Sequence, residues 1–180
     1  MSTKSFFREK SVLITGASAG IGEELALQLA AAGAKVTLSA RRRDQLESLA
    51  QKIALLGHGK AAVAECDVTR DGDLERAVET AVRTFGGLDV AIANAGFGVK
   101  GPIQALTLDD YRRQFETNVF GVLRTIFASL PQIQKRRGNI VEQSALLFTL
   151  KAHSAKRHGF VSTCDLPVGY ASVWGSRKPL

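Results

Sequence analysis

The segment from Thr15 to Gly22 constrains the fold more than any other, because its three glycines separate an apolar run from an amphipathic one. The run at residues 11–14 indicates a buried strand, and leucines recurring on one face of residues 23–30 indicate a helix. Glycines between a strand and a helix start let the backbone approach a pyrophosphate, whose charge the helix N-terminus stabilises. A tight turn that binds no ligand also needs glycine. The strand–loop–helix context nevertheless favours nucleotide binding.

Strand and helix patterns alternate along the first three-quarters of the chain. Short apolar or β-branched runs indicate strands, and apolar residues at helical spacing indicate the helices between them. We expect further strands at residues 35–39, 61–65, 88–93 and 138–141, and helices at 43–56, 71–85 and 107–130. Thr107 is the expected N-cap of the longest helix, and Pro131 is expected to end it.

This alternation predicts the fold class. Strands that alternate with helices form right-handed βαβ units and assemble a doubly wound parallel sheet. We therefore predict a three-layer, Rossmann-like α/β fold, incomplete at its C-terminal side, with residues 1–144 as an NAD(P)-binding domain. No clean period continues beyond Val141, so residues 145–180 are predicted to be an aberrant, loop-like or poorly ordered tail.

The composition excludes several classes of protein. The 180 residues are 45% hydrophobic and 23% charged, as in an ordinary globular protein. No apolar run approaches the roughly 20 residues of a membrane helix, and the first residues lack the apolar segment of a signal peptide. Cys66 and Cys164 form neither a metal-ligand pair nor a disulfide framework. We therefore expect a cytoplasmic protein with no metal and no membrane partner.

The chain is basic, with a net charge of +7 and a pI of about 9.7. Its basic residues do not form a face interleaved with aromatic side chains, so no nucleic-acid partner is predicted.

Two arginines follow the strand predicted at residues 35–39. An acidic residue at this place in a dinucleotide-binding fold would bind the ribose hydroxyls and repel a 2′-phosphate. A guanidinium instead matches a phosphate in charge and geometry, so Arg41 and Arg42 favour NADP(H) over NAD(H) as the cofactor. The alternative is a solvated charge run, which is unfavourable beside the positive end of a helix.

Two further predicted strands end in polar or small residues. Asp67, followed by Val68, could accept from an adenine amino group, although a turn or N-cap aspartate explains it equally well. Small residues from Asn94 to Gly96 would let the backbone pass close to a ribose while Asn94 pins the neighbouring strand; a turn would also explain them. The predicted cofactor-binding residues are Gly16, Ser18, Gly20, Ile21, Gly22, Arg41, Arg42, Asp67, Val68, Asn94, Ala95 and Gly96.

Two residues are candidates for the chemistry. Asn118 lies inside the long predicted helix, where asparagine is unfavourable, and its neighbours are apolar. Its amide is therefore expected to have an assigned polar partner, the alternative being a satisfied core amide. Ser144 follows the fifth predicted strand, where its hydroxyl could polarise a substrate carbonyl, but taken alone it is simply a serine.

The motifs resemble, in order and spacing, those of the short-chain dehydrogenase/reductase family over residues about 8–144. They are Thr15-Gly-x3-Gly-x-Gly22, Arg41, Asp67-Val68, Asn94-Ala-Gly96, Asn118 and Gly138-Asn-Ile-Val141 followed by Ser144. The resemblance implies an NAD(P)(H)-dependent oxidoreductase acting on a small alcohol or carbonyl substrate. It also implies that Asn118 supports a proton relay, that Ser144 orients the substrate oxygen, and that a Tyr-x3-Lys pair does the acid–base work.

The sequence departs from this pattern in its last part. Where the family places its tyrosine and lysine, this chain has Arg157 and Val161, and neither Tyr111 nor Tyr170 begins a Tyr-x3-Lys motif. The family's members often form homo-oligomers through the long helix and the one after the tyrosine. The second helix has no recognisable counterpart here, so the oligomeric state stays open.

The change of pattern is abrupt at Glu142. A shifted reading frame, which is our hypothesis, an alternative splice end or a degenerate gene would each explain it. We accordingly expect an NADP(H)-dependent oxidoreductase that transfers hydride between nicotinamide and a carbonyl or alcohol. The alternatives are a catalytically inactive nucleotide-binding fragment lacking the Tyr/Lys pair and a frameshifted or alternatively spliced product.

Overall fold

The computed structural model describes residues 6–57, 59–99, 103–143 and 160–162 of the chain. In these residues the strands form one parallel sheet in the order β3-β2-β1-β4-β5-β6. The strands are β1 (Ser11–Thr15), β2 (Lys35–Ala40), β3 (Lys60–Glu65), β4 (Val90–Ala93), β5 (Asn139–Glu142) and β6 (Phe160–Ser162). The helices before β4 are α2 (Gly20–Ala31), α3 (Arg43–Leu55) and α4 (Asp73–Phe85), and a short 3-10 turn (Ile103–Ala105) follows β4.

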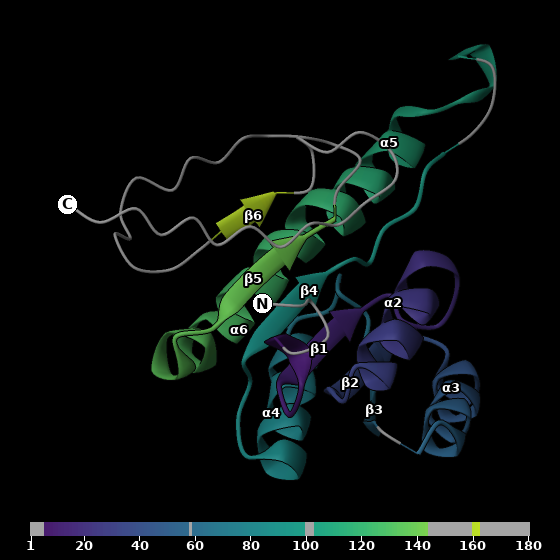
Figure 1. Ribbon diagram of the computed structural model, residues 1–180. Helices are drawn as coiled ribbons and strands as arrows, with labels where there is room; N and C mark the ends of the chain where they lie inside the picture. Colours follow the sequence, from purple (N-terminus) through teal and green to yellow (C-terminus); the bar gives the residue numbers. More distant parts are fainter. Residues whose placement is uncertain (1–5, 58, 100–102, 144–159, 163–180) are drawn as a thin grey trace.

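Helices cover both faces of the sheet (Figure 1). Side chains alternate along a strand, so Val12 and Ile14 of β1 pack with α2 and α3, while Leu13 packs with the helices of the other face. Every residue of β1 and of β4 is buried, as expected for parallel strands covered on both sides. The predicted Rossmann-like fold is confirmed.

The strand order reverses at β1. From β1 the chain proceeds outward to β2 and β3, and then returns to place β4 on the other side of β1. Connections that leave in opposite directions open a crevice at the carboxyl ends of the two central strands. The pairing of Ile14 with Ile92 brings Gly16 and Asn94 to this edge.

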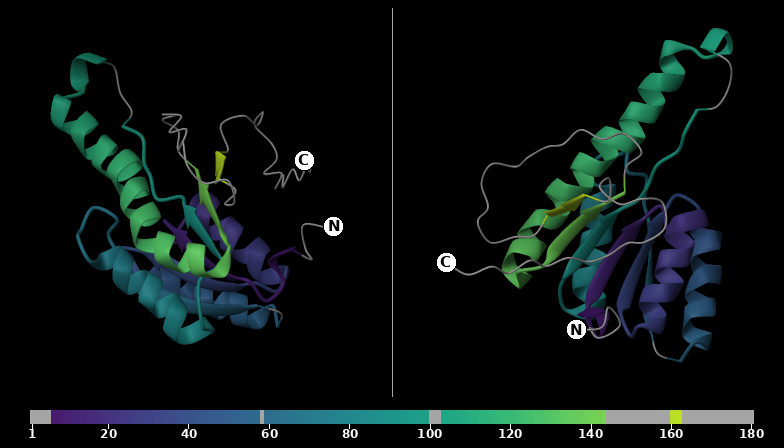
Figure 2. Two further views of the ribbon diagram at one scale, coloured as in Figure 1. Left: turned by 90° about the vertical axis from the view of Figure 1, so that its left-hand side faces the viewer. Right: turned by 45° about the horizontal axis from the view of Figure 1, so that its top comes forward.

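One long helix spans residues 108–136 in three parts. These are α5 (Leu108–Phe115), a π-helical turn (Glu116–Phe120) and α6 (Gly121–Arg136). Thr107 caps it as predicted, because its side chain accepts from Asp110 N while the Asp110 carboxylate accepts from Thr107 N. Figure 2 shows α6 against the sheet and α5 projecting beyond the strands. Among the described residues no helix is both long and apolar enough to cross a membrane.

The prediction that Pro131 ends this helix is wrong, since α6 continues to Arg136. An internal proline removes one backbone donor and costs about 3 kcal/mol, but its fixed φ is a helical one. Ile133, in the turn after the proline, is 2% exposed and packs in the core, and burying such a side chain contributes about 1.5–3 kcal/mol. Packing of this last turn therefore offsets at least half of the cost of the proline.

The sheet also contains a strand that the sequence patterns do not predict. β6 pairs in parallel with β5 in a region predicted to be loop-like. Strand pairing uses main-chain groups, which an edge strand offers to any extended segment, so no amphipathic period is needed. Other differences lie at element ends: α2 begins at Gly20 rather than near residue 23, and β4 begins at Val90 rather than Leu88.

Candidate functional site

The loop after β1 folds tightly onto the start of α2. Gly16 and Gly20 have φ of +68° and +61°, a region that glycine adopts without a steric cost. A Cβ on Gly22 would lie 2.3 Å from the carbonyl oxygen of Gly16, so only glycine fits there. No side chain of the described residues caps α2 at Ala19. Its first backbone N–H groups are therefore suited to an anion.

Thr15 joins the ends of β1 and β4. Its hydroxyl, almost fully buried, accepts from the backbone N–H groups of Asn94 and Ala95, both at 3.0 Å, and donates to the Ile92 carbonyl. The Asn94 amide in turn donates to the Thr15 carbonyl at 2.9 Å. Asn94 thus holds the neighbouring strand, and hydrogen bonds run from β4 to β1 and from β1 to β4 at the edge of the crevice.

The two arginines predicted to bind phosphate lie where β2 meets α3. Arg42 Nη2 donates to Ser18 Oγ at 3.1 Å, which joins this corner to the glycine loop. Both guanidiniums are exposed. A bound anion would therefore meet positive charge from the end of β2 and backbone N–H groups from the loop.

Asp67, at the end of β3, forms a turn. Its Oδ1 accepts from Thr69 N at 3.0 Å and from Thr69 Oγ1 at 2.7 Å. Burial opposes ionisation, but these two hydrogen bonds and the charges of Arg41 and Arg70 outweigh it and lower the pKa of the carboxyl. The turn that the sequence left as an alternative is thus formed, and the carboxylate stays charged at neutral pH.

These segments enclose a cavity of about 240 Å³ at the carboxyl ends of the strands. It is lined by eight predicted cofactor residues: Gly16, Ser18, Arg41, Arg42, Asp67, Val68, Ala95 and Gly96. The other four are Gly20, Ile21, Gly22 and Asn94. Gly22 and Asn94 lie directly against Gly16, where they set the loop's shape, and Ile21 is 60% exposed.

Sequence reasoning missed five residues that also line this cavity: Ala19, Ala40, Cys66, Phe97 and Thr117. Each is a neighbour in sequence of a predicted site residue. Phe97, for example, follows Gly96 directly, and an aromatic residue just past a strand end could have drawn attention to it. Their apolar or small side chains carry no chemical signature by themselves.

Asn118 lies in the π-helical turn with 7% of its surface exposed. Its Oδ1 accepts from Phe97 N at 3.0 Å and its Nδ2 donates to Phe97 O at 2.8 Å. The expected polar partner is thus the backbone of Phe97. A Cβ on Gly96 would lie 3.2 Å from Asn118 Oδ1, so the segment passes close beneath the amide. Ser144, the other catalytic candidate, lies outside the described residues.

The Cys66 thiol is expected to react slowly in the folded protein. Burial raises the pKa of this thiol from 9.0 to about 11, so the folded state holds about a hundredfold less thiolate than the unfolded state below pH 9. The unfolded thiol ionises at lower pH than the folded one. The contribution of Cys66 to the free energy of unfolding is therefore full below pH 9 and is lost as the pH rises to about 11. Timed labelling with a thiol reagent in a Cys164→Ser variant, native and in urea, measures this. Equal rates in the two states contradict it.

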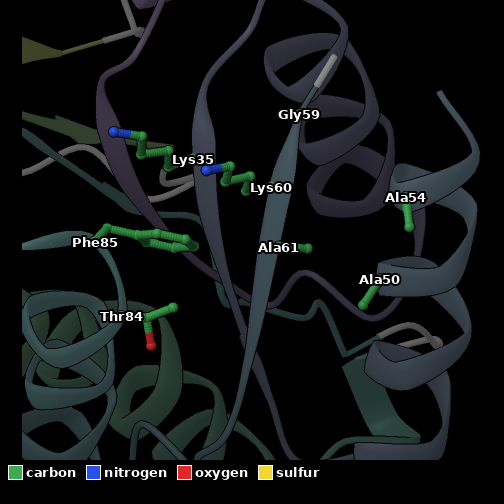
Figure 3. A pocket seen from close by; sticks show the side chains of 8 residues that line it. All are labelled: Lys35, Ala50, Ala54, Gly59, Lys60, Ala61, Thr84 and Phe85. Carbon is green, nitrogen blue, oxygen red and sulfur yellow. The ribbon is translucent and has the colours of Figure 1, made fainter. Parts of the chain in front are cut away.

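A larger hollow, of about 500 Å³, lies at the opposite ends of the strands (Figure 3). Lys35 and Lys60, the first residues of β2 and β3, extend to the same side of it. Lys35 Nζ is already paired with Glu9 at 2.8 Å. No predicted cofactor residue lines this hollow, and parallel sheets bind ligands at their carboxyl ends, so the smaller cavity is the candidate site.

Known proteins resemble this chain in sequence and in fold. A sequence profile of the family described as short chain dehydrogenase matches residues 10–149. An uncharacterized oxidoreductase of Listeria innocua is 39% identical over 140 residues, which cover 77% of this chain and 56% of that protein.

Two solved structures share the fold at comparable identity. A 7α-hydroxysteroid dehydrogenase complexed with NADH and 7-oxo glycochenodeoxycholic acid has a TM-score of 0.72 at 32% identity, over 79% of this chain and 56% of that one. An alcohol dehydrogenase from the archaeon Thermococcus sibiricus complexed with 5-hydroxy-NADP has a TM-score of 0.70 at 32% identity, over 74% and 57%. The chain spans about half the length of the curated relatives it matches. Its fold, its glycine loop and the profile match agree, and the chain belongs to the short-chain dehydrogenase family.

Proposed function

We propose that this chain forms the coenzyme-binding part of an NADP(H)-dependent oxidoreductase that acts on a small carbonyl or alcohol substrate. The observation that carries the proposal is the contact of Arg42 with Ser18 beside the cavity. This contact brings a guanidinium from the end of β2 to the glycine loop. The guanidinium and the N-terminus of α2 then supply the two sources of positive potential that a phosphorylated dinucleotide needs.

The cavity's own residues fit such a coenzyme. The absence of a Cβ at Gly16 and Gly22 lets the loop pack tightly against Ala95 and the start of α2. The pyrophosphate would lie at the N-terminus of α2, which no side chain of the described residues caps. Arg41 and Arg42 would hold a 2′-phosphate, and Asp67 and Val68 would lie against the adenine. When bound, the nicotinamide supplies or accepts a hydride. Asn118 would support a proton relay, and Ser144 would orient the substrate oxygen.

The Arg42→Ala variant tests the coenzyme preference. Hydrogen bonds to charged groups contribute about 1.5–3 kcal/mol, so loss of the guanidinium is expected to weaken NADPH binding about 10- to 100-fold. NADH affinity should stay within about twofold, because it has no 2′-phosphate. Fluorescence titration with each reduced coenzyme measures both.

Arg43→Ala is the matched control, because Arg43 Nε pairs with Glu47 on the surface of α3 and does not line the cavity. It should leave both affinities unchanged. Equal losses for NADPH and NADH in Arg42→Ala would contradict a phosphate-binding role and leave only a general effect of charge.

A second candidate function is binding of the nucleotide without turnover. It is favoured by one observation, that no Tyr-x3-Lys pair occurs in the sequence. Titration with NADPH together with turnover of a panel of aldehydes and ketones separates the candidates. Binding with turnover supports the oxidoreductase, and binding without turnover supports the silent module. The absence of both binding and turnover supports an aberrant translation product.

A further inference from the structure

The segment after β4 is attached to the long helix by two side-chain amides. Asn118 holds both backbone groups of Phe97. Gln114, four residues earlier in the helix, accepts from the backbone N–H of Val99 through Oε1 at 3.0 Å. Figures 1 and 2 show the segment running from β4 along the α5 end of the helix.

The spacing of the two amides matches the chain that they bind. Four residues of helix rise about 6 Å, and two residues of an extended chain span about 6.7 Å. Side chains one helical turn apart can therefore reach alternate residues of an extended segment, here Phe97 and Val99. The helix thus provides the hydrogen bonds that a neighbouring strand would otherwise provide.

The attached segment includes one wall of the cofactor cavity. Ala95, Gly96 and Phe97 line the cavity, and the bond from Thr15 holds only the start of the segment, at Asn94 and Ala95. Without the bond to Gln114, the hydrogen bonds found between this segment and the helix in the described residues would hold it only at Phe97, and Val99 would lose its attachment.

We propose that Gln114 is a positioning residue for coenzyme binding, which acts by holding residues 97–99 against the helix. This inference rests on the proposed function, since it takes the cavity as the coenzyme site. Gln114 itself does not line the cavity. Its effect should therefore appear in coenzyme affinity and in local exchange rather than in contact with the ligand.

Two substitutions separate the hydrogen bond from the bulk of the side chain. Gln114→Met keeps the length and a similar helix propensity but removes the acceptor, whereas Gln114→Glu keeps an acceptor oxygen. Gln28→Met is the matched control, because the exposed side chain of Gln28 bonds only to Glu24 among the interactions found in the described residues. The readouts are amide hydrogen exchange of residues 94–99 and the Kd for NADPH by fluorescence titration.

Loss of one hydrogen bond should make the 97–99 amides of Gln114→Met exchange about tenfold faster and raise its Kd for NADPH about tenfold. Gln114→Glu should stay within about threefold of the wild type in both readouts, and Gln28→Met should change neither. A retained exchange pattern in Gln114→Met overturns the attachment. Faster exchange in Gln114→Met with an unchanged Kd overturns the positioning role. A Kd in Gln114→Glu that is as weak as in Gln114→Met overturns it too. A wild type that binds neither coenzyme overturns the proposed function and the coenzyme role of Gln114 with it, while the exchange pattern still reports the attachment separately.

Discussion

Alanine in place of Gly22 is expected to weaken coenzyme binding by at least about a hundredfold and to lower the free energy of unfolding by about 1–3 kcal/mol. The added Cβ would lie 2.3 Å from Gly16 O and 2.6 Å from Asn94 Nδ2. The loop cannot move away from this contact, because Gly16 is packed against Ala95: a Cβ on Gly16 would lie only 2.8 Å from the Ala95 Cα. Urea unfolding and NADPH titration measure the two effects.

Two other glycines provide the controls for this experiment. A Cβ on Gly98 meets no described atom within 4 Å, so Gly98→Ala should change the free energy of unfolding by less than about 0.5 kcal/mol. A Cβ on Gly138 would lie 2.1 Å from Asp89 O, at the amino end of β5. Gly138→Ala should therefore destabilise the fold while the folded fraction binds coenzyme normally. Wild-type affinity in Gly22→Ala would show that the loop is not the coenzyme site.

Valine in place of Thr15 is expected to lower the free energy of unfolding by about 2–6 kcal/mol, a large part of the net stability of a domain, which is about 5–15 kcal/mol. Valine has nearly the same shape, but it leaves the N–H groups of Asn94 and Ala95 without their acceptor. Each such loss costs about 1–3 kcal/mol in a partly buried site. Urea unfolding measures the loss of stability, and coenzyme affinity should fall as well, because Ala95 lines the cavity.

Thr37→Val is the matched control, since Thr37 is fully buried in β2 but its hydroxyl has no hydrogen-bond partner among the described residues. Removing that hydroxyl should leave stability unchanged or raise it. Thr15→Ser keeps the hydroxyl and should lose only about 1 kcal/mol, the value of one methyl group. If Thr15→Val and Thr37→Val behave alike, the threonine at the end of β1 does not join the strands.

Much of the fold could be read from local patterns. The strand at β1, the helix cap at Thr107 and the glycine loop each depend on residues within a few positions of one another. Most of the candidate site could be predicted from the sequence as well, because its residues lie at the ends of predicted strands. Five of its lining residues were missed because small or apolar side chains have no pattern that marks a cavity wall.

Other features depend on contacts between residues far apart in sequence. The continuation of α6 past Pro131 follows from burial of Ile133 beneath the sheet. The partner of Asn118 is 21 residues away at Phe97, and the bond from Val99 to Gln114 joins two segments with no motif in common. None of these has a local signature, because each depends on where the sheet places a distant backbone.

The sequence alone determined the alternation of strands and helices, the tight glycine turn and the arginines that follow β2, since backbone propensity, steric room and charge are properties of neighbouring residues. Packing in three dimensions sets which strand ends meet, how Thr15 joins β1 to β4 and how the long helix holds the segment after β4. Those arrangements depend on burial and hydrogen bonding between groups that the chain brings together only when the sheet has formed.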